Sequence, residues 1–401
     1  MSPISPMRPI LPILLLLLSS CSEHDDLPTP VSEPVPTERP ISFASSLQEQ
    51  EVVTRTGLEE VLTDKTFVAF GYKNDAYEGG TYTSYQAVMP GFVVNWLENS
   101  AHTTAANTHD WEYLNQGPDQ TIKYWDWSAL AYRFFGYANG NATASPATEP
   151  VPVTVTGGTA ANVPNDNAVT FSADVDATSE ATIDAAPYFT RLWYSDGNPT
   201  HYPDKQFGQA VHLQFLKPFA RVRFMFTFIE GLTFDRKDIR NISFHPTEVA
   251  GVQPTIAMKG NVSVSYPLKG SETTESWSFT PSTTPSDGLD AFTIDYYETP
   301  SPVPTGFPAS AAATDWPNTP QKWYIVFPAP NQGSYTLQAC VVTDEVRTVV
   351  IPAEYMKWKA GYEYTYSFKV TESGGITIDI VQVAISDWSN RRSSDYSVYN
   401  W

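Results

Sequence analysis

Apolar and polar residues alternate with a period of two in several long runs, and this pattern restricts the fold more than any other feature. The run VHLQFLKPFARVRFMFTF, residues 211–228, puts Val211, Leu213 and Phe215 on one face and resumes its alternation at Ala220. Successive side chains of a β-strand point to opposite faces, so the run predicts two strands, each with one buried face. Lys217-Pro218 between them predicts a bulge or a bend.

Two further runs with the same pattern lie near the C-terminus. WKAGYEYTYSFKV, residues 358–370, puts four rings on one face, at Tyr362, Tyr364, Tyr366 and Phe368. ITIDIVQVAISDW, residues 376–388, begins with three isoleucines in phase, Ile376, Ile378 and Ile380, and then switches phase at Val381. Ser373-Gly374-Gly375 between these runs has the composition of a hairpin turn, which predicts an antiparallel pair. Helical periodicity is scarce, so we expect an all-β fold.

The N-terminus carries a short apolar run, residues 10–18, which follows Arg8 and is interrupted by Pro12. Spanning a bilayer takes about 20 apolar residues, so the run predicts a cleaved export signal. Leu18-Ser19-Ser20-Cys21 resembles the lipobox of bacterial lipoproteins, which implies that Cys21 becomes the lipid-bearing (palmitate-type) first residue of the mature chain. The alternative is an incidental cysteine near a standard cleavage site. The acidic residues after Cys21 resemble the surface-export signal of some Gram-negative lipoproteins.

Charge and cysteine content exclude several classes of protein. If Cys21 carries lipid, Cys340 is the single remaining cysteine, so an exported chain of this kind folds without an internal disulfide. The 24 basic and 44 acidic residues give a net charge of −20, which repels phosphates and makes nucleic acid an unfavourable partner. No second long apolar run occurs, so we expect membrane attachment through the lipid alone.

Composition divides the chain into five parts. The signal peptide covers residues 1–20, and a proline-rich tether containing LPTPVSEPVPTERP covers residues 21–40. The loop-like stretch HYPDKQFG precedes the first long alternating run and predicts a domain boundary. We therefore expect an N-terminal β-sandwich domain at 41–207, a C-terminal β-sandwich domain at 208–390 and a tail at 391–401.

No constellation of residues indicates catalysis or a metal site. The chain lacks a G-x-S-x-G elbow, an H-E-x-x-H helix, a C-x-x-C pair and a phosphate-binding glycine loop, so we expect no enzyme and no cofactor. Aromatic residues are concentrated in KYWDWSALAYRFFGY, residues 123–137. They are interpreted either as a stacking platform for sugar rings or as core packing, and core packing is favoured.

The start of the first expected domain combines an apolar strand with an exposed cleavage site. Ile41, Phe43 and Leu47 share one face of a possible first strand, and Arg55 followed by Thr56 is a tryptic-type site. Arg39 is followed by a proline, which hinders cleavage there. A cut after Arg55 removes the first strand and leaves an apolar groove with unpaired main-chain groups, an edge that another strand should fill.

The chain end supplies a candidate for that other strand. The tail RRSSDYSVYNW contains large apolar side chains, among them Tyr396 and Val398. Such side chains are unusual in a solvated terminus, so they indicate either insertion into a neighbouring subunit or folding back onto the tail's own domain.

The motifs, taken in order, resemble the fimbrillin family, the lipoprotein-derived pilins also called type V pilins. The resemblance is carried by the lipobox at Cys21, then ISF and VVTRTG, KYWDW and YRFFGY, AVHLQFLKPFARVRF, WYIVFP, WKAGYEYTYSF and ISDW. Family members often have a histidine where this chain has Leu216-Lys217-Pro218. The resemblance implies two tandem transthyretin-like (Ig-like) antiparallel β-sandwich domains, export as a lipoprotein, and removal of the first strand by an arginine-specific protease. It also implies that a C-terminal strand of a neighbouring subunit fills the groove.

By this resemblance Arg55 is the processing site, Ile41 and Phe43 belong to the displaced strand, and the segment from Ile376 onward contains the donor. We therefore expect a structural or adhesive fimbrial subunit at the cell outer membrane. Its expected partners are other fimbrial subunits, the protease and a surface receptor. Two alternatives stay open. One is an uncleaved anchor or accessory subunit, and the other is a monomeric surface glycan-binding lipoprotein that uses Trp125 or Trp127.

Overall fold

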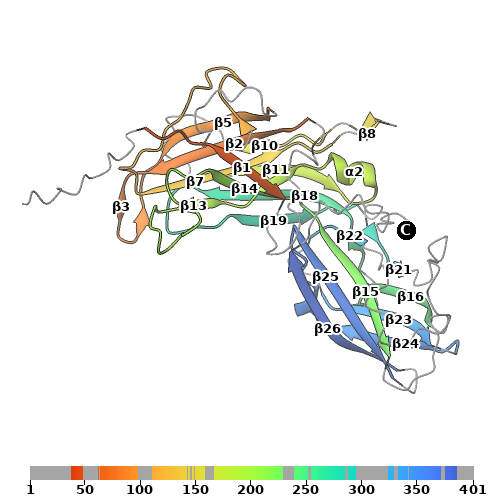
Figure 1. The fold of residues 1–401 in the computed structure, drawn as a ribbon. Helices are drawn as coiled ribbons and strands as arrows, with labels where there is room; N and C mark the ends of the chain where they lie inside the picture. Colours follow the sequence, from red (N-terminus) through yellow and green to blue (C-terminus); the bar gives the residue numbers. More distant parts are fainter. Residues whose placement is uncertain are drawn as a thin grey trace, which may run out of the picture. The chain divides into compact units, whose positions relative to one another are not determined.

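The computed structural model consists almost entirely of strands joined by loops, which confirms the expected all-β class (Figure 1). It describes residues 38–47, 62, 64–97, 111–141, 143–144, 147–148, 150–158, 167–228, 239–251, 254–284, 288–294, 324–328, 333–341, 343–371 and 375–385. Within this part the helices are α2 (Glu180–Ala185) and the 3₁₀ helix η4 (Ala353–Met356). Neither of these helices has the length and apolar character needed to cross a membrane.

Seven of the described strands form a closed ring. Their order is β12-β14-β1-β6-β5-β2-β7, and β12 pairs with β7 as well as with β14, which closes the ring. An eighth strand, β13 (Trp193–Ser195), pairs with β7. The bounds of the ring strands are β1 (Phe43–Leu47), β2 (Thr66–Asn74), β5 (Gln86–Trp96), β6 (Trp111–Glu112), β7 (Ala131–Ala138), β12 (Tyr188–Thr190) and β14 (Val211–Leu216).

The ring encloses an aromatic core. Alternate residues of each strand point inward, as the pleat of a β-strand requires. The most buried of these inward side chains share one hydrophobic cluster with Ile41, just before β1, and Tyr113, just after β6, and are Phe43, Phe67, Ala69, Met89, Val94, Trp111, Tyr132, Phe134, Val211, Leu213 and Phe215. On β2 and β7 the residues between them, such as Phe70, Tyr72 and Phe135, face the other way and belong to a second hydrophobic cluster.

A four-stranded sheet covers the other face of β2 and β7. It has the order β10-β11-β18-β19 and is formed by β10 (Thr154–Thr156), β11 (Ala168–Asp176), β18 (Lys259–Pro267) and β19 (Ser276–Pro281). Phe135 of β7 stacks on Tyr266 of β18 with ring centroids 4.2 Å apart. The ring centroids of Phe70 of β2 and Phe171 of β11 lie 5.1 Å apart. These contacts join the ring and this sheet into one packed unit.

Two further four-stranded sheets pack face to face in the C-terminal half. One has the order β22-β15-β25-β26, and the other has the order β21-β16-β23-β24. Phe224 of β15 and Phe244 of β16 meet across the interface with centroids 4.7 Å apart. The strand bounds are β15 (Ala220–Phe228), β16 (Ile239–Pro246), β21 (Phe292–Ile294), β22 (Tyr324–Val326), β23 (Tyr335–Val341), β24 (Val346–Ile351), β25 (Tyr362–Val370) and β26 (Ile376–Ile385).

Short two-stranded pairs complete the described strands. They are β3 (Tyr77–Glu78) with β4 (Thr81–Tyr82), β8 (Thr143–Ala144) with β9 (Ala147–Thr148), and β17 (Ile256–Ala257) with β20 (Gly288–Leu289).

The expected domain boundary between residues 207 and 208 does not separate the sheets. β14 follows this point in sequence but lies in the ring, parallel to β1. β18 and β19 also follow it, yet they extend the sheet of β10 and β11. The stretch HYPDKQFG is a connection between β13 and β14, two strands of the same sheet. Loop composition marks a connection, but it does not tell which sheets the connection joins.

The chain leaves the ring between β14 and β15, at Lys217-Pro218. The two predicted alternating runs are confirmed, and they are separated by a bend that carries the chain from one sheet to another. The Lys217 side chain is buried, and its ammonium donates to the carbonyl oxygens of Ile183 at 3.0 Å and of Asp184 at 3.2 Å. It also lies 4.1 Å from the ring centroid of Tyr188. The bend is thereby fixed to the C-terminal end of α2, where backbone carbonyls favour a cation.

The predicted C-terminal hairpin is confirmed, with one correction to the phase of its second strand. β25 and β26 pair antiparallel, and Tyr364, Tyr366 and Phe368 of β25 are buried. Ile378 pairs with Phe368, but Ile380 pairs with Ser367, so Asp379 is an extra residue in β26. The phase therefore switches before Ile380 and not after it. A β-bulge inserts one unpaired residue in this way, and the sequence shows only that a switch occurs nearby.

This bulge predicts different outcomes for two single-residue deletions. Deleting Asp379 removes the extra residue and leaves every Cα pair of β25 and β26 in place. Deleting Gln382 instead moves Val383 from Tyr364 to Thr365 and reverses the face of the residues that follow. We expect the Asp379 deletion to keep the wild-type midpoint of thermal unfolding, and the Gln382 deletion to lower stability by about 2 kcal/mol or more. Equal midpoints for the two deletions would contradict the register.

Candidate functional site

The strand β1 is an interior member of the ring although it lies near the N-terminus of the chain (Figure 1). On one side it runs parallel to β14, from the pair Phe43 and Val211 to the pair Leu47 and Phe215. On the other side Phe43 pairs antiparallel with Trp111 of β6. A strand with neighbours on both sides has its main-chain groups in two ladders. Removing β1 therefore breaks both ladders.

The residues just before β1 are hydrogen-bonded to the loop that contains KYWDW. The Ile41 N–H donates to the carbonyl of Lys123 at 2.8 Å, and the Trp125 N–H donates to the carbonyl of Arg39 at 2.9 Å. The hydroxyl of Tyr113 donates to the carbonyl of Ile41 at 3.0 Å. Burial raises the pKa of Tyr113 well above its ordinary value, so the phenol stays protonated and keeps this bond. The first strand is thus held from residue 39 onward.

Two of the three predicted apolar residues of this strand are fully buried. Ile41 and Phe43 are 0% exposed. The ring of Phe43 meets three other rings edge-on, with centroid distances of 5.8 Å to Phe67, 6.1 Å to Tyr113 and 6.1 Å to Phe134. Burial of one such side chain contributes roughly 1.5–3 kcal/mol. The third residue, Leu47, lies in β1 opposite Phe215, and its side chain is outside the described part.

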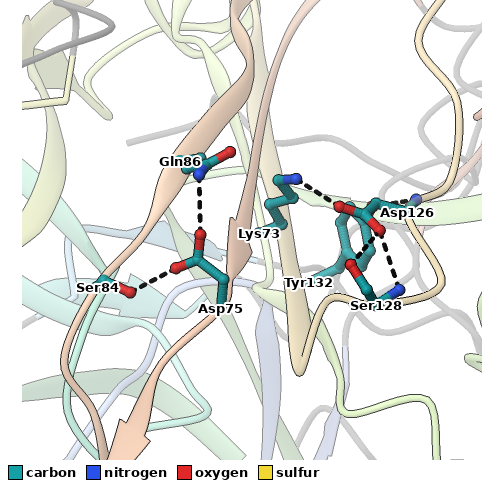
Figure 2. Close-up of polar contacts among 7 residues, drawn as sticks. All are labelled: Lys73, Asp75, Ser84, Gln86, Asp126, Ser128 and Tyr132. Atoms are coloured by element: carbon teal, nitrogen blue, oxygen red, sulfur yellow. Dashed lines mark hydrogen bonds and ion pairs between the residues drawn. The ribbon is translucent and has the colours of Figure 1, made fainter.

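An ion pair attaches the KYWDW loop to β2. The Lys73 ammonium donates to the carboxylate of Asp126 at 2.6 Å (Figure 2). The same carboxylate accepts from the Ser128 N–H at 2.9 Å, and the Asp126 N–H donates to the Tyr132 hydroxyl at 2.7 Å. The hydrogen bond from Lys73, followed by those from Ser128, lowers the pKa of Asp126 to about 2. These contacts fix the loop that in turn binds residues 39–41.

The two tryptophans of KYWDW have different environments. Trp125 is buried in the ring core, where its ring stacks on Phe207 at 5.5 Å. Trp127 is 44% exposed. Core packing is therefore confirmed for Trp125 and is wrong for Trp127, because Trp127 lies in a turn and not on a strand. A glycan platform cannot use the buried ring of Trp125.

The predicted donor residues that the structure describes belong to the protein's own C-terminal sheet. Ile376, Ile378 and Ile380 lie in β26 and pair with β25. Ile376 is buried and Ile378 is partly buried against the core. β1 and β26 lie in different sheets, so the structure does not bring the displaced strand and the donor candidates together. Among the described strands, β26 pairs with β25 alone.

The other predicted site residues lie outside the described part of the chain. They are the lipidation residue Cys21, the processing residues Arg55 and Thr56, and the tail residues Tyr396 and Val398.

The sequence did not reveal the partners of the first strand. Trp111, Tyr113 and Lys123 contact β1 or residues 39–41, yet no alternating run leads to them. Their stretch is short, and only its aromatic content is a signal. The pairing of β1 with β14, about 170 residues away in sequence, has no local signal at all.

No protein-family model matches this chain, and no curated protein matches it. Solved structures do match. A fimbrial protein from Bacteroides vulgatus is 13% identical with a TM-score of 0.39, over 86% of this chain and 99% of that one. A candidate cell adhesion protein from Bacteroides uniformis is 11% identical with a TM-score of 0.35, over 88% and 99%. A candidate polysaccharide-binding protein from Bacteroides thetaiotaomicron is 12% identical with a TM-score of 0.28, over 88% and 99%. Similarity at this level establishes neither a family nor a function for this chain.

Truncating Phe43 should destabilise the protein strongly. Phe43→Ala removes a fully buried ring that contacts three others, and such changes cost about 3–5 kcal/mol. Chemical denaturation of the full chain measures this loss. The control is Tyr77→Ala, which truncates a ring that is 54% exposed and should change stability by about 0.5 kcal/mol or less. A loss at Phe43 as small as that at Tyr77 would show that β1 contributes little to the ring.

The Asp126–Lys73 pair predicts a pH dependence of stability. The pKa of Asp126 is lower in the folded protein than its ordinary value, so the stabilisation is present above about pH 4 and is lost as the pH falls toward 2. Because the pair is partly exposed, Asp126→Asn should cost about 1 kcal/mol or less at pH 7. The difference from wild type should vanish near pH 2.

Asp75→Asn is the matched control, because Asp75 accepts hydrogen bonds from the neutral side chains of Ser84 and Gln86 (Figure 2). Unfolding curves between pH 2 and pH 7 make the comparison. A difference between wild type and Asp126→Asn that stays constant over this range would contradict the role of the ion pair.

Proposed function

We propose that this chain is a structural or adhesive fimbrial subunit that polymerises by donor-strand complementation. In this mechanism the precursor is cut after Arg55, which removes the first strand, and a strand of a neighbouring subunit takes its place. The process is thermodynamic and requires no catalytic residue in the chain.

The observation that carries this proposal is the position of β1. The strand is the N-terminal strand of the described chain and yet lies between β14 and β6 inside a closed ring. A single cut in the segment that follows Leu47 separates β1 from the rest of the ring covalently. One cut removes a central strand if no other part of the fold precedes it, and β1 is the first strand of the described residues.

Loss of residues 39–47 leaves a groove of defined chemistry. β14 loses its parallel ladder with β1, and the carbonyl of Lys123 loses the Ile41 N–H. The rings of Phe67, Tyr113 and Phe134 lose their contact with Phe43. Unpaired ladder groups and exposed rings favour binding of another extended strand, as in β-strand addition.

The donor is proposed to lie at the C-terminal end of the neighbouring chain. Ile376, Ile378 and Ile380 pair with β25 in their own subunit, so their use as a donor would require β26 to leave β25. The tail beyond Ile385, which carries Tyr396 and Val398, can act without that loss. We therefore favour the tail as the inserting segment. Its apolar side chains would occupy the positions of Ile41 and Phe43.

The route to the surface is part of the same proposal. Cys21 carries the lipid that holds the precursor at the cell outer membrane until an arginine-specific protease cuts after Arg55. The partners are other fimbrial subunits, this protease and a receptor on a host or bacterial surface. The proposal also includes two tandem transthyretin-like sandwich domains. The first contains the ring and the sheet of β10, β11, β18 and β19, and the second contains the two C-terminal sheets.

Two alternatives differ in what happens to the first strand. An anchor or accessory subunit would keep its lipid and stay uncut at Arg55. A monomeric glycan-binding lipoprotein would bind sugar through an exposed ring such as Trp127, which is 44% exposed.

Limited digestion of the lipid-free precursor with an arginine-specific protease tests the proposal. We expect one cut after Arg55, followed by oligomers that resist denaturant, because the inserted strand restores both ladders and the buried rings. Mass spectrometry locates the cut, and size-exclusion chromatography follows assembly. Arg55→Ala should abolish both results. The matched control is Arg39→Ala, which should change neither, because Pro40 already hinders cleavage at that position.

Two results would contradict the proposal in different ways. Resistance of Arg55 to cleavage would favour the uncut anchor subunit. A cut product that stays monomeric would exclude strand exchange by this route.

A further inference from the structure

A cleft that contains no residue of β1 lies beside β13, β14 and β19. It has a volume of about 900 Å³, within the range of pockets that bind small molecules. Its lining comes from five places in the chain: residues 191–194 at β13, residues 202–205, His212 and Gln214 of β14, residues 273–279 at β19, and residues 357–360 with Tyr362 at the start of β25.

The cleft reverses the charge balance of the chain. Acidic residues outnumber basic ones by 44 to 24 in the whole sequence. The lining instead contains four basic and two acidic side chains, namely Arg191, Lys205, Lys357, Lys359, Asp204 and Glu275. Glu275 is 6% exposed and lies 3.3 Å from the Arg191 guanidinium, so these two charges balance each other and three lysines stand against Asp204 in the rest of the lining. A concave surface with an excess of cations favours an anionic ligand.

Arg191 is held in position by its neighbours. Glu275 accepts from its Nη1 at 3.3 Å and also from the Leu192 N–H at 2.9 Å, which fixes the carboxylate to the backbone. Arg191 Nη2 donates to the Tyr362 hydroxyl at 3.1 Å. These contacts use two of the five N–H donors of a guanidinium, and the side chain is 33% exposed. The planar group is therefore oriented and can still bind a carboxylate.

Flat aromatic surfaces line the same cleft. The rings of Trp277 and Phe279 stack with centroids 6.0 Å apart and an interplanar angle of 11°, and both are partly exposed. Trp277 Nε1 donates to Glu275 at 3.3 Å, so the carboxylate that positions Arg191 also positions the indole. Apolar ring faces suit the C–H faces of pyranose sugars. Gln214, Thr273 and Thr274 add neutral donors and acceptors for hydroxyl groups.

A peptide fits this lining less well than a sugar. Among the lining residues the aliphatic side chains are Leu192 and Ala360, and both are buried. The cleft therefore offers little aliphatic surface against which the apolar side chains of a peptide could pack. The combination of cations, flat rings and neutral polar groups instead matches a sugar that carries an acid group.

We propose that this cleft binds a carboxylated oligosaccharide. The carboxylate binds Arg191, with Lys357 and Lys359 adding positive charge, and the sugar rings lie against Trp277 and Tyr362. The site contains no residue of β1, although His212 and Gln214 of its lining lie in β14, opposite Ala44 and Ser46 of β1. The uncut chain already contains the complete site, so Arg55→Ala should bind the sugar as wild type does.

Calorimetric titration of the lipid-free precursor tests the site with trigalacturonic acid, 3′-sialyllactose and a hyaluronan tetrasaccharide. We expect at least one to bind at concentrations up to about 1 mM. Its methyl ester, which lacks the charge, should bind about tenfold more weakly, and added salt should weaken the acid form. Lys357→Glu combined with Lys359→Glu should abolish binding, and both side chains are exposed, so the fold should be kept. Trp277→Ala should weaken binding about tenfold.

Two matched controls lie outside the cleft. Trp127→Ala removes an exposed indole, and Arg347→Ala removes a partly exposed guanidinium that pairs with Glu345. Neither should change the affinity. The proposal is overturned if none of the three sugars binds, if acid and ester bind equally, or if Trp127→Ala removes binding while the cleft variants do not. Tighter binding of a hexaglutamate peptide would assign the cleft to acidic peptides and would also overturn it.

Discussion

The closure of the ring by β12 is the constraint on which the N-terminal half of the structure depends. β12 pairs with β14 on one side and β7 on the other, so every strand of the ring has two neighbours. Closure of a sheet shortens or removes its edges, although here β5 pairs with β6 through Asn95 and Trp96 only. Closure therefore gives β1 partners on both sides within its own chain. The same closure means that loss of any one strand creates two edges at once, together with a gap in the core.

β1 is the ring strand for which this matters, because of its place in the sequence. The other ring strands are continuous with the fold at both ends, whereas β1 is preceded by the tether and followed by the segment that contains Arg55. Many contacts hold β1 in the ring. Ile41 and Phe43 are fully buried, and residues 39–41 bind a loop that the Asp126–Lys73 pair attaches to β2. In the proposed mechanism a replacement strand must therefore offer comparable burial and hydrogen bonding.

The sequence predicted local strands well and their assembly poorly. The alternation in residues 211–228 and 358–370 located β14, β15 and β25, because burial of one face of a strand leaves a period of two. The same patterns could not show that β14 pairs with β1 while β15 pairs with β25 in another sheet. Both pairings are parallel and join distant residues, so neither has a turn between its strands to mark it. The predicted boundary at residue 207 was wrong for this reason.

The candidate site shows the same division between local and distant information. Ile41 and Phe43 were identified from their spacing alone, and both are buried in the structure. Their partners Trp111, Tyr113 and Lys123 were not identified, because they belong to a stretch without periodicity. No pattern in the sequence predicted the cleft around Arg191. Its cations come from residues 191, 205, 357 and 359, which are dispersed in a strongly acidic chain. Net charge describes the average surface, whereas binding depends on the charges that folding brings together at one place. Here folding places Glu275 against Arg191, so that one acid is neutralised and the remaining cations face the cleft, and an acidic protein acquires a surface suited to an anion.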